Sequence, residues 1–167
     1  MRICSLLPSA TEIVAELGLA DSLVGVSEEC DWPPAVRGLP VVTASRVDTT
    51  RLSSLEIERS VRDAVRDGRQ LYAVDRELLE TLNPDVILTQ KLCDVCAPSY
   101  GSVAALASTL PTKPRVLNLE PRSLGDMFDK IREVASALEA PDSADAVCRE
   151  LERRVEKVVE RVVGLPR

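Results

Sequence analysis

Short apolar runs alternate with longer amphipathic segments along the chain, and this alternation constrains the fold more than any other feature. The runs have the length of buried strands, whereas the longer segments repeat apolar residues every three or four positions, as helices do. We expect strands at 2–7, 23–26, 39–42, 85–89 and 115–119, and helices at about 9–17, 54–67, 75–82, 99–110, 123–139 and 142–163. This order predicts an α/β domain with three layers around a mainly parallel sheet.

Capping residues mark the ends of several expected helices. Ser9 and Glu12 have the spacing of a capping box, Asp75 and Asp142 precede helical patterns, and Gly18 suits a left-handed C-terminal cap. Two interpretations of Ser9 and Glu12 follow. They cap the helix that starts there, or they lie against a ligand, because the free N–H groups of a helix start can hold an anion.

Histidine is absent from the 167 residues, which removes the commonest general base, the Ser-His triad and His-ligated metals. Lys and Arg number 21 and Asp and Glu 27, so the net charge is −6, and the chain has one Trp, one Phe and two Tyr. An acidic chain with few aromatic residues is a poor candidate for nucleic-acid binding. No apolar run approaches the length of a membrane span. We therefore expect a non-catalytic protein with no nucleic-acid partner and no membrane insertion.

The cysteines and the N-terminal segment bear on the compartment. The apolar run Ile3–Leu7 ends at Pro8 and is shorter than the apolar region of a secretory signal. Five cysteines are scattered along the chain, which suits a reducing compartment better than a disulfide framework. We expect a cytoplasmic protein. The alternative is a periplasmic or extracellular protein from which a leader has been removed.

A Cys-x-x-Cys pair, Cys93 and Cys96, follows the expected strand at 85–89. Two thiolates at this spacing suit zinc, a redox disulfide or a soft metal centre such as iron–sulfur. One pair is half of a four-ligand structural zinc site, and Cys30 is the candidate third ligand because it also follows a strand. Cys4 and Cys148 lie within an expected strand and helix, so we expect both to be buried.

An acidic loop with the only Trp follows the second expected strand. It carries Glu28, Glu29 and Asp31 together with Cys30 and Trp32. In an open α/β sheet, the loops that leave the carboxyl ends of the strands form the ligand crevice. Trp32 therefore either marks a binding surface or folds inward as a packing lid.

Three segments together resemble the N-terminal lobe of the helical-backbone periplasmic binding proteins: Arg2–Ile13, Val24–Pro34 and Leu82–Leu88. Members of that family are the solute-binding proteins of ABC importers for cobalamin, ferric siderophores and haem. Within the family, 27–31 and 89–96 resemble a leaderless cobalamin-binding-like subgroup. The resemblance implies a Rossmann-like ligand-binding lobe at 1–140 and a long inter-lobe helix at 141–167, with no second lobe in this sequence.

The resemblance also implies a function. The chain would bind a corrinoid or another metal chelate without catalysis, as the substrate-binding component of an ABC uptake system or a cytoplasmic relative of one. We expect the ligand contacts to come from Ser9, Thr11, Glu29, Asp31, Trp32 and Gln90. Glu77 resembles the surface glutamate with which family members pair to arginines of the permease; the alternative is an ordinary exposed helix acid.

Few aromatic residues are available to line a corrinoid cleft, and this keeps other functions open. One is a cytoplasmic protein that binds zinc or iron at Cys93 and Cys96, or senses redox state there, on the same fold. Another is an enzyme of corrinoid metabolism, for which no catalytic base is identifiable. In each case, the apolar surface that a second lobe would cover predicts a homodimer through the exposed lobe face.

Overall fold

A four-stranded parallel sheet forms the centre of the computed structural model, which describes residues 1–47, 49–90 and 98–164. Its strands, in spatial order, are β2 (Leu23–Val26), β1 (Ile3–Ser5), β5 (Val86–Thr89) and β6 (Arg115–Asn118). Each neighbouring pair runs parallel. The predicted mainly parallel α/β fold is therefore confirmed.

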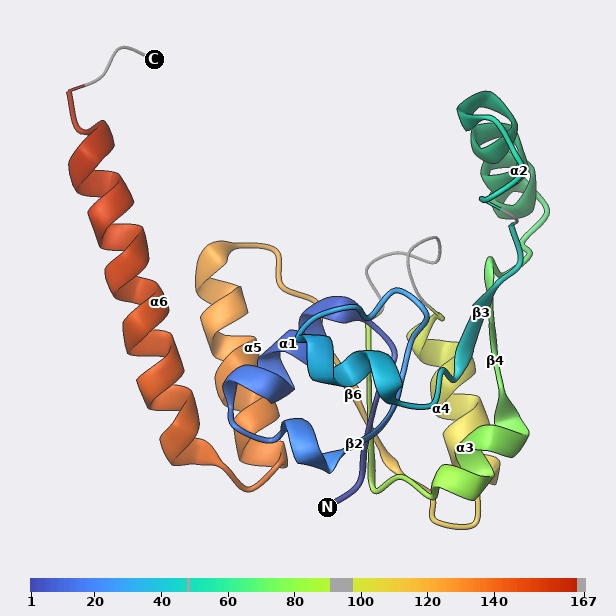
Figure 1. The fold of residues 1–167 in the computed structure, drawn as a ribbon, viewed down its shortest axis with the longest axis horizontal. Coiled ribbons are helices and arrows are strands. Elements are labelled where there is room, and N and C mark those ends of the chain that lie inside the picture. The colour runs from blue at the N-terminus through green and yellow to red at the C-terminus, as the bar shows by residue number, and fades with distance from the viewer. Residues whose placement is uncertain (48, 91–97, 165–167) are drawn as a thin grey trace.

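Helices cover both faces of this sheet and complete the three layers (Figure 1). One face carries α1 (Pro8–Glu16), α5 (Leu124–Ala137) and α6 (Pro141–Val162); the other carries α3 (Arg76–Leu82) and α4 (Tyr100–Thr109). Successive residues of β1 face opposite layers, because Ile3 packs with Val14 and Val134, whereas Cys4 packs with Leu79. Burial on both faces explains the unbroken apolar run at the start of the central strand β5.

A second, antiparallel pair of strands lies beside the sheet. It consists of β3 (Thr43–Ser45) and β4 (Tyr72–Val74), and α2 (Ser54–Arg66) lies between them in the sequence; we call β3, α2 and β4 the arm. The arm projects from the body (Figure 1). The strand expected at 39–42 is wrong, because the ladder starts at Thr43 and Val41 forms only an isolated bridge with Val26. β4 was not expected, since three residues are too few to show a strand pattern.

The arm also departs from the burial that its sequence predicts. The periodicity of 54–67 indicates a buried stripe through Ile57, Val61, Ala64 and Val65. Only Ala64 is buried among the four, and Val65 is 52% exposed. The stripe is wrong because α2 projects beyond the sheet and meets the rest of the protein along a short length (Figure 1).

Helix starts follow the prediction in some places and not in others. Asp75 accepts a hydrogen bond from the Leu78 N–H at 2.9 Å and Gly18 has φ +79°, so both predicted caps are confirmed. The capping box of Ser9 is wrong: α1 begins one residue earlier, at Pro8, and its N-cap Leu7 has no side-chain hydrogen bond. α6 likewise begins at Pro141, not after an Asp142 cap. Proline suits the first helical position because its fixed φ matches the helix and its missing N–H is not needed there.

The last helix, α6, is 22 residues long and stands beyond the lobe at its C-terminal end (Figure 1). Its first half is anchored by the buried Ala144 and Cys148, whereas Val158 and Val162 in its second half are more than half exposed. Short turns η1 (Ala20–Ser22) and η2 (Pro34–Gly38) complete the described elements. Within the described residues, no helix combines the length and apolarity that a membrane crossing requires.

Candidate functional site

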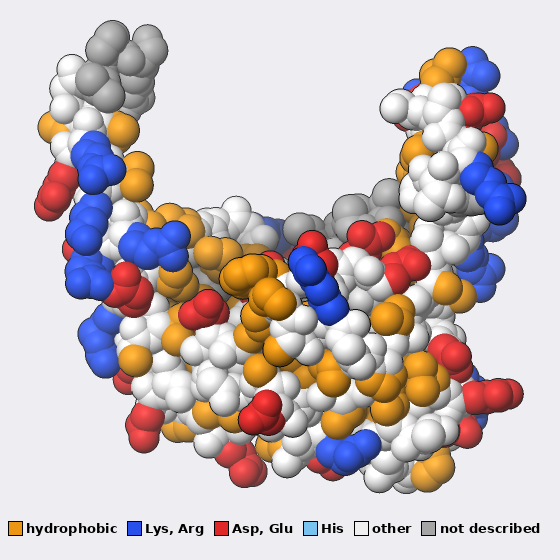
Figure 2. Space-filling view, viewed as in Figure 1, with side chains coloured by type: hydrophobic (Ala, Val, Ile, Leu, Met, Phe, Trp, Pro, Cys, Tyr) orange, Lys and Arg blue, Asp and Glu red, His pale blue; other side chains and the backbone are white. Residues whose placement is uncertain are grey.

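The carboxyl ends of the parallel strands meet at the floor of a hollow in the molecular surface. Figure 2 shows this hollow between two projections, which are α6 on one side and the arm on the other. The residues that leave the strand ends there are Leu6 after β1, Ser27 after β2, Gln90 after β5 and Leu119 after β6. Ligands of open α/β sheets bind at this edge, so we take it as the candidate site.

A buried polar cluster fixes the loop after β2 against the start of α1. We call Ser5, Thr11, Ser27 and Cys30 the hydroxyl–thiol cluster. The Thr11 hydroxyl donates to the Ser5 Oγ at 2.8 Å, and the Cys30 Sγ lies 3.1 Å from the Thr11 Oγ1 and 3.6 Å from the Ser27 Oγ. All four side chains are buried. The cluster therefore holds the loop in one position from beneath.

Two of the predicted site residues belong to this cluster. Thr11 has no exposed surface and directs its hydroxyl at the protein, so in this conformation it supports the loop. Cys30 is 7% exposed, with a hydroxyl on each side. Burial raises the pKa of the neighbouring Cys4 thiol, and the charge of Cys30 adds to this. Cys4 and Cys148 are buried, as predicted.

The acidic loop presents its other side chains to solvent. Glu29, Asp31 and Trp32 are exposed, and Trp32 exposes 56% of its surface, which excludes an inward packing lid. Partial burial raises the pKa of the Glu28 carboxyl, the neighbouring Glu29 raises it further, and a backbone hydrogen bond from Ser45 partly opposes both. The loop thus offers one large aromatic surface beside several carboxylates.

The remaining predicted residues lie at different places. Ser9 is exposed on the first turn of α1, at the rim of a cavity of about 700 Å³ between α1, α5 and α6. Gln90 is half-buried and bridges to Ser99 at the floor of the hollow. Glu77 is exposed on the first turn of α3, well away from the hollow (Figure 1). The roles of all these residues stay predictions.

The predicted metal ligands Cys93 and Cys96 lie outside the described residues. Across the part of the chain that the structure describes, no three His, Cys, Asp or Glu side chains are grouped as a metal site requires. Cys30, the third proposed ligand, contacts hydroxyl groups there.

Polar residues at the end of β6 and directly after it belong to the same edge and were missed by the sequence analysis. The Asn118 amide donates to Glu120 at 3.2 Å, and Arg122 pairs with Glu120, also at 3.2 Å. The Asn118 Oδ1 is buried without a hydrogen-bond partner among the described residues. Glu120 and Arg122 directly follow the expected strand 115–119, and Asn118 lies at its end; this position was the signal that could have found them.

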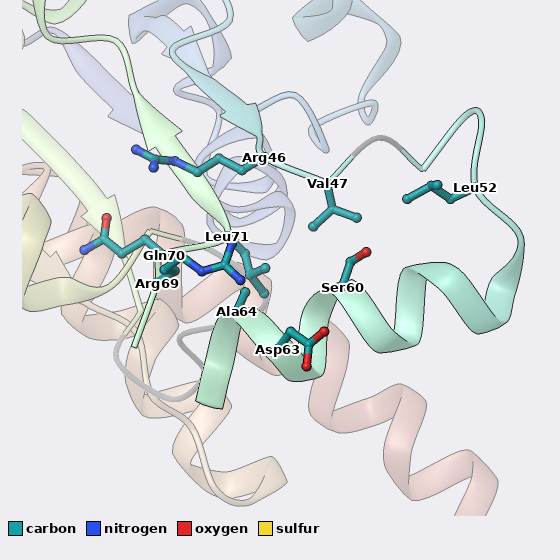
Figure 3. Close-up of a pocket in the computed structure, with 9 residues that line it drawn as sticks. All are labelled: Arg46, Val47, Leu52, Ser60, Asp63, Ala64, Arg69, Gln70 and Leu71. Carbon is teal, nitrogen blue, oxygen red and sulfur yellow. The ribbon is translucent and has the colours of Figure 1, made fainter. Parts of the chain in front are cut away.

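A smaller cavity of about 330 Å³ lies within the arm. Figure 3 shows Ala64 on α2 beside Leu71 and Ser60 on the side of Val47, while the Arg46 and Gln70 side chains extend away from α2. Asp63 is paired with Arg66 at 3.0 Å, and Arg69 with Asp67 at 3.2 Å. Asp63 and Arg69 are thus paired within the arm, and we take the strand ends as the better candidate for a ligand site.

Comparisons with known proteins agree with this architecture. Residues 3–167 match the family model described as periplasmic binding protein. A periplasmic solute-binding protein from Staphylococcus epidermidis superposes with a TM-score of 0.70 at 22% identity, over 96% of this chain and 51% of that one. The periplasmic vitamin B12-binding protein of Vibrio cholerae gives 0.68 at 22%, over 98% and 51%, and a periplasmic heme-binding protein of Pseudomonas aeruginosa gives 0.69 at 20%, over 97% and 47%.

The TM-scores show a shared fold, and the chain spans about half the length of the solved structures that it matches. A search of curated proteins found no match.

Proposed function

Because the chain belongs to the periplasmic binding protein family, we propose that it binds a metal chelate, and a corrinoid in particular, at the strand-end edge. It does so without catalysis, as the substrate-binding component of an ABC-type uptake system or a relative of one. The observation that carries the proposal is the family match across residues 3–167, which includes every strand end that opens on the hollow.

The side chains at the edge suit such a ligand. A corrinoid is a large, flat macrocycle whose rim carries amide groups that donate hydrogen bonds. The exposed Trp32 supplies an aromatic surface for the macrocycle, and Glu29 and Asp31 supply acceptors for the amides.

The solved structures that resemble this chain are about twice its length. This chain therefore corresponds to about half of each of them. We also propose that Glu77 contacts arginines of a permease, because it is exposed on α3 and clear of the hollow.

The free thiols of Cys4, Cys30 and Cys148 support a cytoplasmic location.

Trp32 is the only Trp in the chain, so its fluorescence reports on the site directly. Corrinoids and haem absorb at the wavelength of Trp emission, and binding beside Trp32 should quench it. We would titrate the protein with hydroxocobalamin, haemin and a ferric hydroxamate, and measure the same affinities by calorimetry. Saturable quenching by hydroxocobalamin supports the proposal. No heat and no quenching with any of the three overturns it.

A matched pair of variants locates the site. Trp32 and Leu55 are each 56% exposed, but Leu55 lies on α2. Trp32→Ala should weaken hydroxocobalamin binding about 10-fold or more by calorimetry, the loss expected for an aromatic contact. Leu55→Ala should leave it unchanged. Equal hydroxocobalamin affinities for both variants would show that the ligand does not bind at Trp32.

The second candidate function is a thiol site at Cys93 and Cys96, and the cysteine content of the chain favours it. Cys30 lies on the loop that follows β2, and β1 lies between β2 and β5 in the sheet. Elemental analysis of protein purified under reducing conditions tests this function. Near-stoichiometric zinc or iron that is lost in Cys93→Ser/Cys96→Ser would support it, and metal-free protein would exclude a resident metal.

A further inference from the structure

Glu28, on the acidic loop, contacts the arm. Its backbone N–H donates to the Thr43 hydroxyl at 3.1 Å, and its carboxylate accepts a hydrogen bond from the Ser45 N–H. Thr43 and Ser45 are the first and last residues of β3, the strand through which the chain enters the arm (Figure 1). One residue of the acidic loop is therefore bonded to both ends of that strand.

The geometry of β3 explains why the Ser45 N–H is available to Glu28. The Arg46 N–H donates to the Leu71 carbonyl at 2.7 Å, on the side of β4. The N–H groups of adjacent residues in an antiparallel strand point in opposite directions, so the Ser45 N–H points away from β4. The Glu28 carboxylate occupies this open strand edge and satisfies the donor there.

The same stretch of the acidic loop is held from its other side by the hydroxyl–thiol cluster. Ser27 and Cys30 of that cluster bracket Glu28, and the Cys30 N–H donates to the Ser27 carbonyl at 3.0 Å, which closes a tight turn. Trp32 lies two residues beyond Cys30. A displacement of Glu28 is therefore passed along this turn to Trp32.

We infer that Glu28 is a positioning residue through which the arm holds Trp32 in place at the candidate site. Coupling between two parts of a protein is reciprocal, so a ligand that orders Trp32 also orders the arm. The arm suits such a response, because Ala64 is the one buried residue of α2, and regions with few buried apolar contacts open at low free energy. The effect of a ligand rests on the proposed function, whereas the coupling itself is measurable in the ligand-free protein.

Time-resolved fluorescence anisotropy of Trp32, the only Trp in the chain, measures the nanosecond motion of the acidic loop. Glu28→Ala removes the acceptor for the Ser45 N–H, so the amplitude of the fast decay should increase. Glu28→Gln should restore the wild-type decay, because its amide oxygen can accept the same bond. Glu29→Ala is the matched control, since Glu29 is exposed on the same loop and its side chain makes no hydrogen bond to the described part of the arm.

A mutant cycle tests whether the arm acts on Trp32 through these bonds. Leu71 is 4% exposed at the base of the arm, so Leu71→Ala should loosen β3 against β4 and increase the fast decay of Trp32. In the Glu28→Ala/Thr43→Val background both bonds to the acidic loop are absent, and Leu71→Ala should add nothing. Equal increases in the two backgrounds would show that the arm and Trp32 move independently.

Amide hydrogen exchange measures the coupling in the other direction. Loss of one hydrogen bond should speed local exchange about 2- to 10-fold, so Glu28→Ala should accelerate exchange in β3 and β4 by that factor and leave β5 unchanged. Hydroxocobalamin should slow exchange in α2 of the wild type, and it should slow exchange less in Glu28→Ala.

Three outcomes would overturn the inference: an unchanged anisotropy decay in Glu28→Ala, a Glu28→Gln variant that behaves like Glu28→Ala, or equal effects of Leu71→Ala in the two backgrounds. The second would mean that the bond to Ser45 does not hold the loop. A wild-type protein that fails to bind hydroxocobalamin would contradict the proposed function alone, because the anisotropy measurements use the ligand-free protein.

Discussion

The Thr11 hydroxyl lies 3.1 Å from the Cys30 sulfur, and this contact joins the first turns of α1 to the acidic loop after β2. The same hydroxyl donates to Ser5 at the end of β1. One buried side chain thus ties together the two strand ends and the helix that border the candidate site. The position of Trp32, two residues beyond Cys30, depends on this contact.

Thr11→Val should destabilise the protein. Valine has nearly the same shape as threonine but cannot pair with Ser5 or Cys30, so their buried polar atoms each lose a partner. We expect a loss of about 1–3 kcal/mol in the free energy of unfolding, measured by urea denaturation. Thr81→Val is the control, because the Thr81 hydroxyl bonds the Glu77 carbonyl on an exposed helix face. It should change stability by less than about 0.5 kcal/mol; equal losses would argue against the cluster's role.

Gly25→Ala should also destabilise the protein, through crowding. An added Cβ at this position in β2 would lie 2.8 Å from a Leu82 methyl carbon and 3.1 Å from a Val42 methyl carbon. Overpacking of a buried site costs about 1–3 kcal/mol. Gly38→Ala is the matched control, because its Cβ would have no neighbour within 4 Å. Thermal or urea midpoints would show the difference, and a neutral Gly25→Ala would mean that β2 can shift.

The sequence predicted the sheet well because the central strand Val86–Thr89 is buried on both faces, and it reads as an apolar run, as 23–26 and 116–117 also do. It failed at the arm for the opposite reason. β4 is three residues long with every side chain half-buried, so no contrast between faces appears in the sequence. Val65 reads as part of a helical stripe, but no element covers it. Tertiary context decided both cases.

The candidate site was predicted in part. Strand order and loop composition assigned Glu29, Asp31 and Trp32 to one loop at this edge but left open whether Trp32 is exposed; the structure exposes all three. The sequence could not show that Thr11 is buried and Ser9 exposed. A shift of the helix start by one residue decides which of the two side chains faces inward. Asn118 was missed because an amide that ends a strand has no motif of its own; its unpaired oxygen is visible only in three dimensions.

The start of α5 should give the stability a dependence on acid. The Ser123 hydroxyl donates to Asp126 at 2.8 Å, and this bond, with a backbone N–H from Arg122, lowers the pKa of the Asp126 carboxyl. A lowered folded-state pKa contributes stability above the unfolded value of about 3.9, and the contribution is lost as the pH falls through the folded value.

Asp126→Asn and Ser123→Ala should therefore reduce stability at pH 7 and flatten its decline below about pH 4. Ser108→Ala is the control, since the Ser108 hydroxyl only bonds a carbonyl within α4. Urea midpoints measured from pH 7 downwards would check this. Parallel pH profiles for wild type and Asp126→Asn would contradict it.

Glu28 should affect the pH dependence of stability in the direction opposite to Asp126. Burial and the adjacent Glu29 raise its pKa, so its charged form is disfavoured in the folded state. Stability should then rise as the pH falls through the raised value, and Glu28→Gln should be more stable than wild type at pH 7. Because the side chain is mostly exposed, the gain should be on the order of 0.5 kcal/mol or less. The advantage should vanish below about pH 4.3, the unfolded-state pKa of glutamate. A variant that is equally stable at pH 7 would mean that solvent screens the charge fully.

The arm should be the least stable part of the described fold. In α2 only Ala64 is buried, and Leu71, 4% exposed, is the large apolar side chain that joins the base of the arm. In contrast, Leu88 in β5 is fully buried between two helical layers. Regions with few buried apolar contacts open locally at a lower free energy than the core does. Amide exchange in α2 should therefore be faster than in β1 and β5.

Leu71→Ala and Leu88→Ala distinguish local from global opening. Each removes the same atoms, and a buried Leu→Ala change costs about 2–5 kcal/mol at a core site. Leu88→Ala should accelerate exchange throughout the sheet and lower the urea midpoint, because β5 pairs with β1 and β6. Leu71→Ala should accelerate exchange in α2 and β4 and leave β1 and β5 protected, since the Leu71 side chain anchors only the arm. Uniform acceleration by Leu71→Ala would show that the arm and the sheet unfold as one unit.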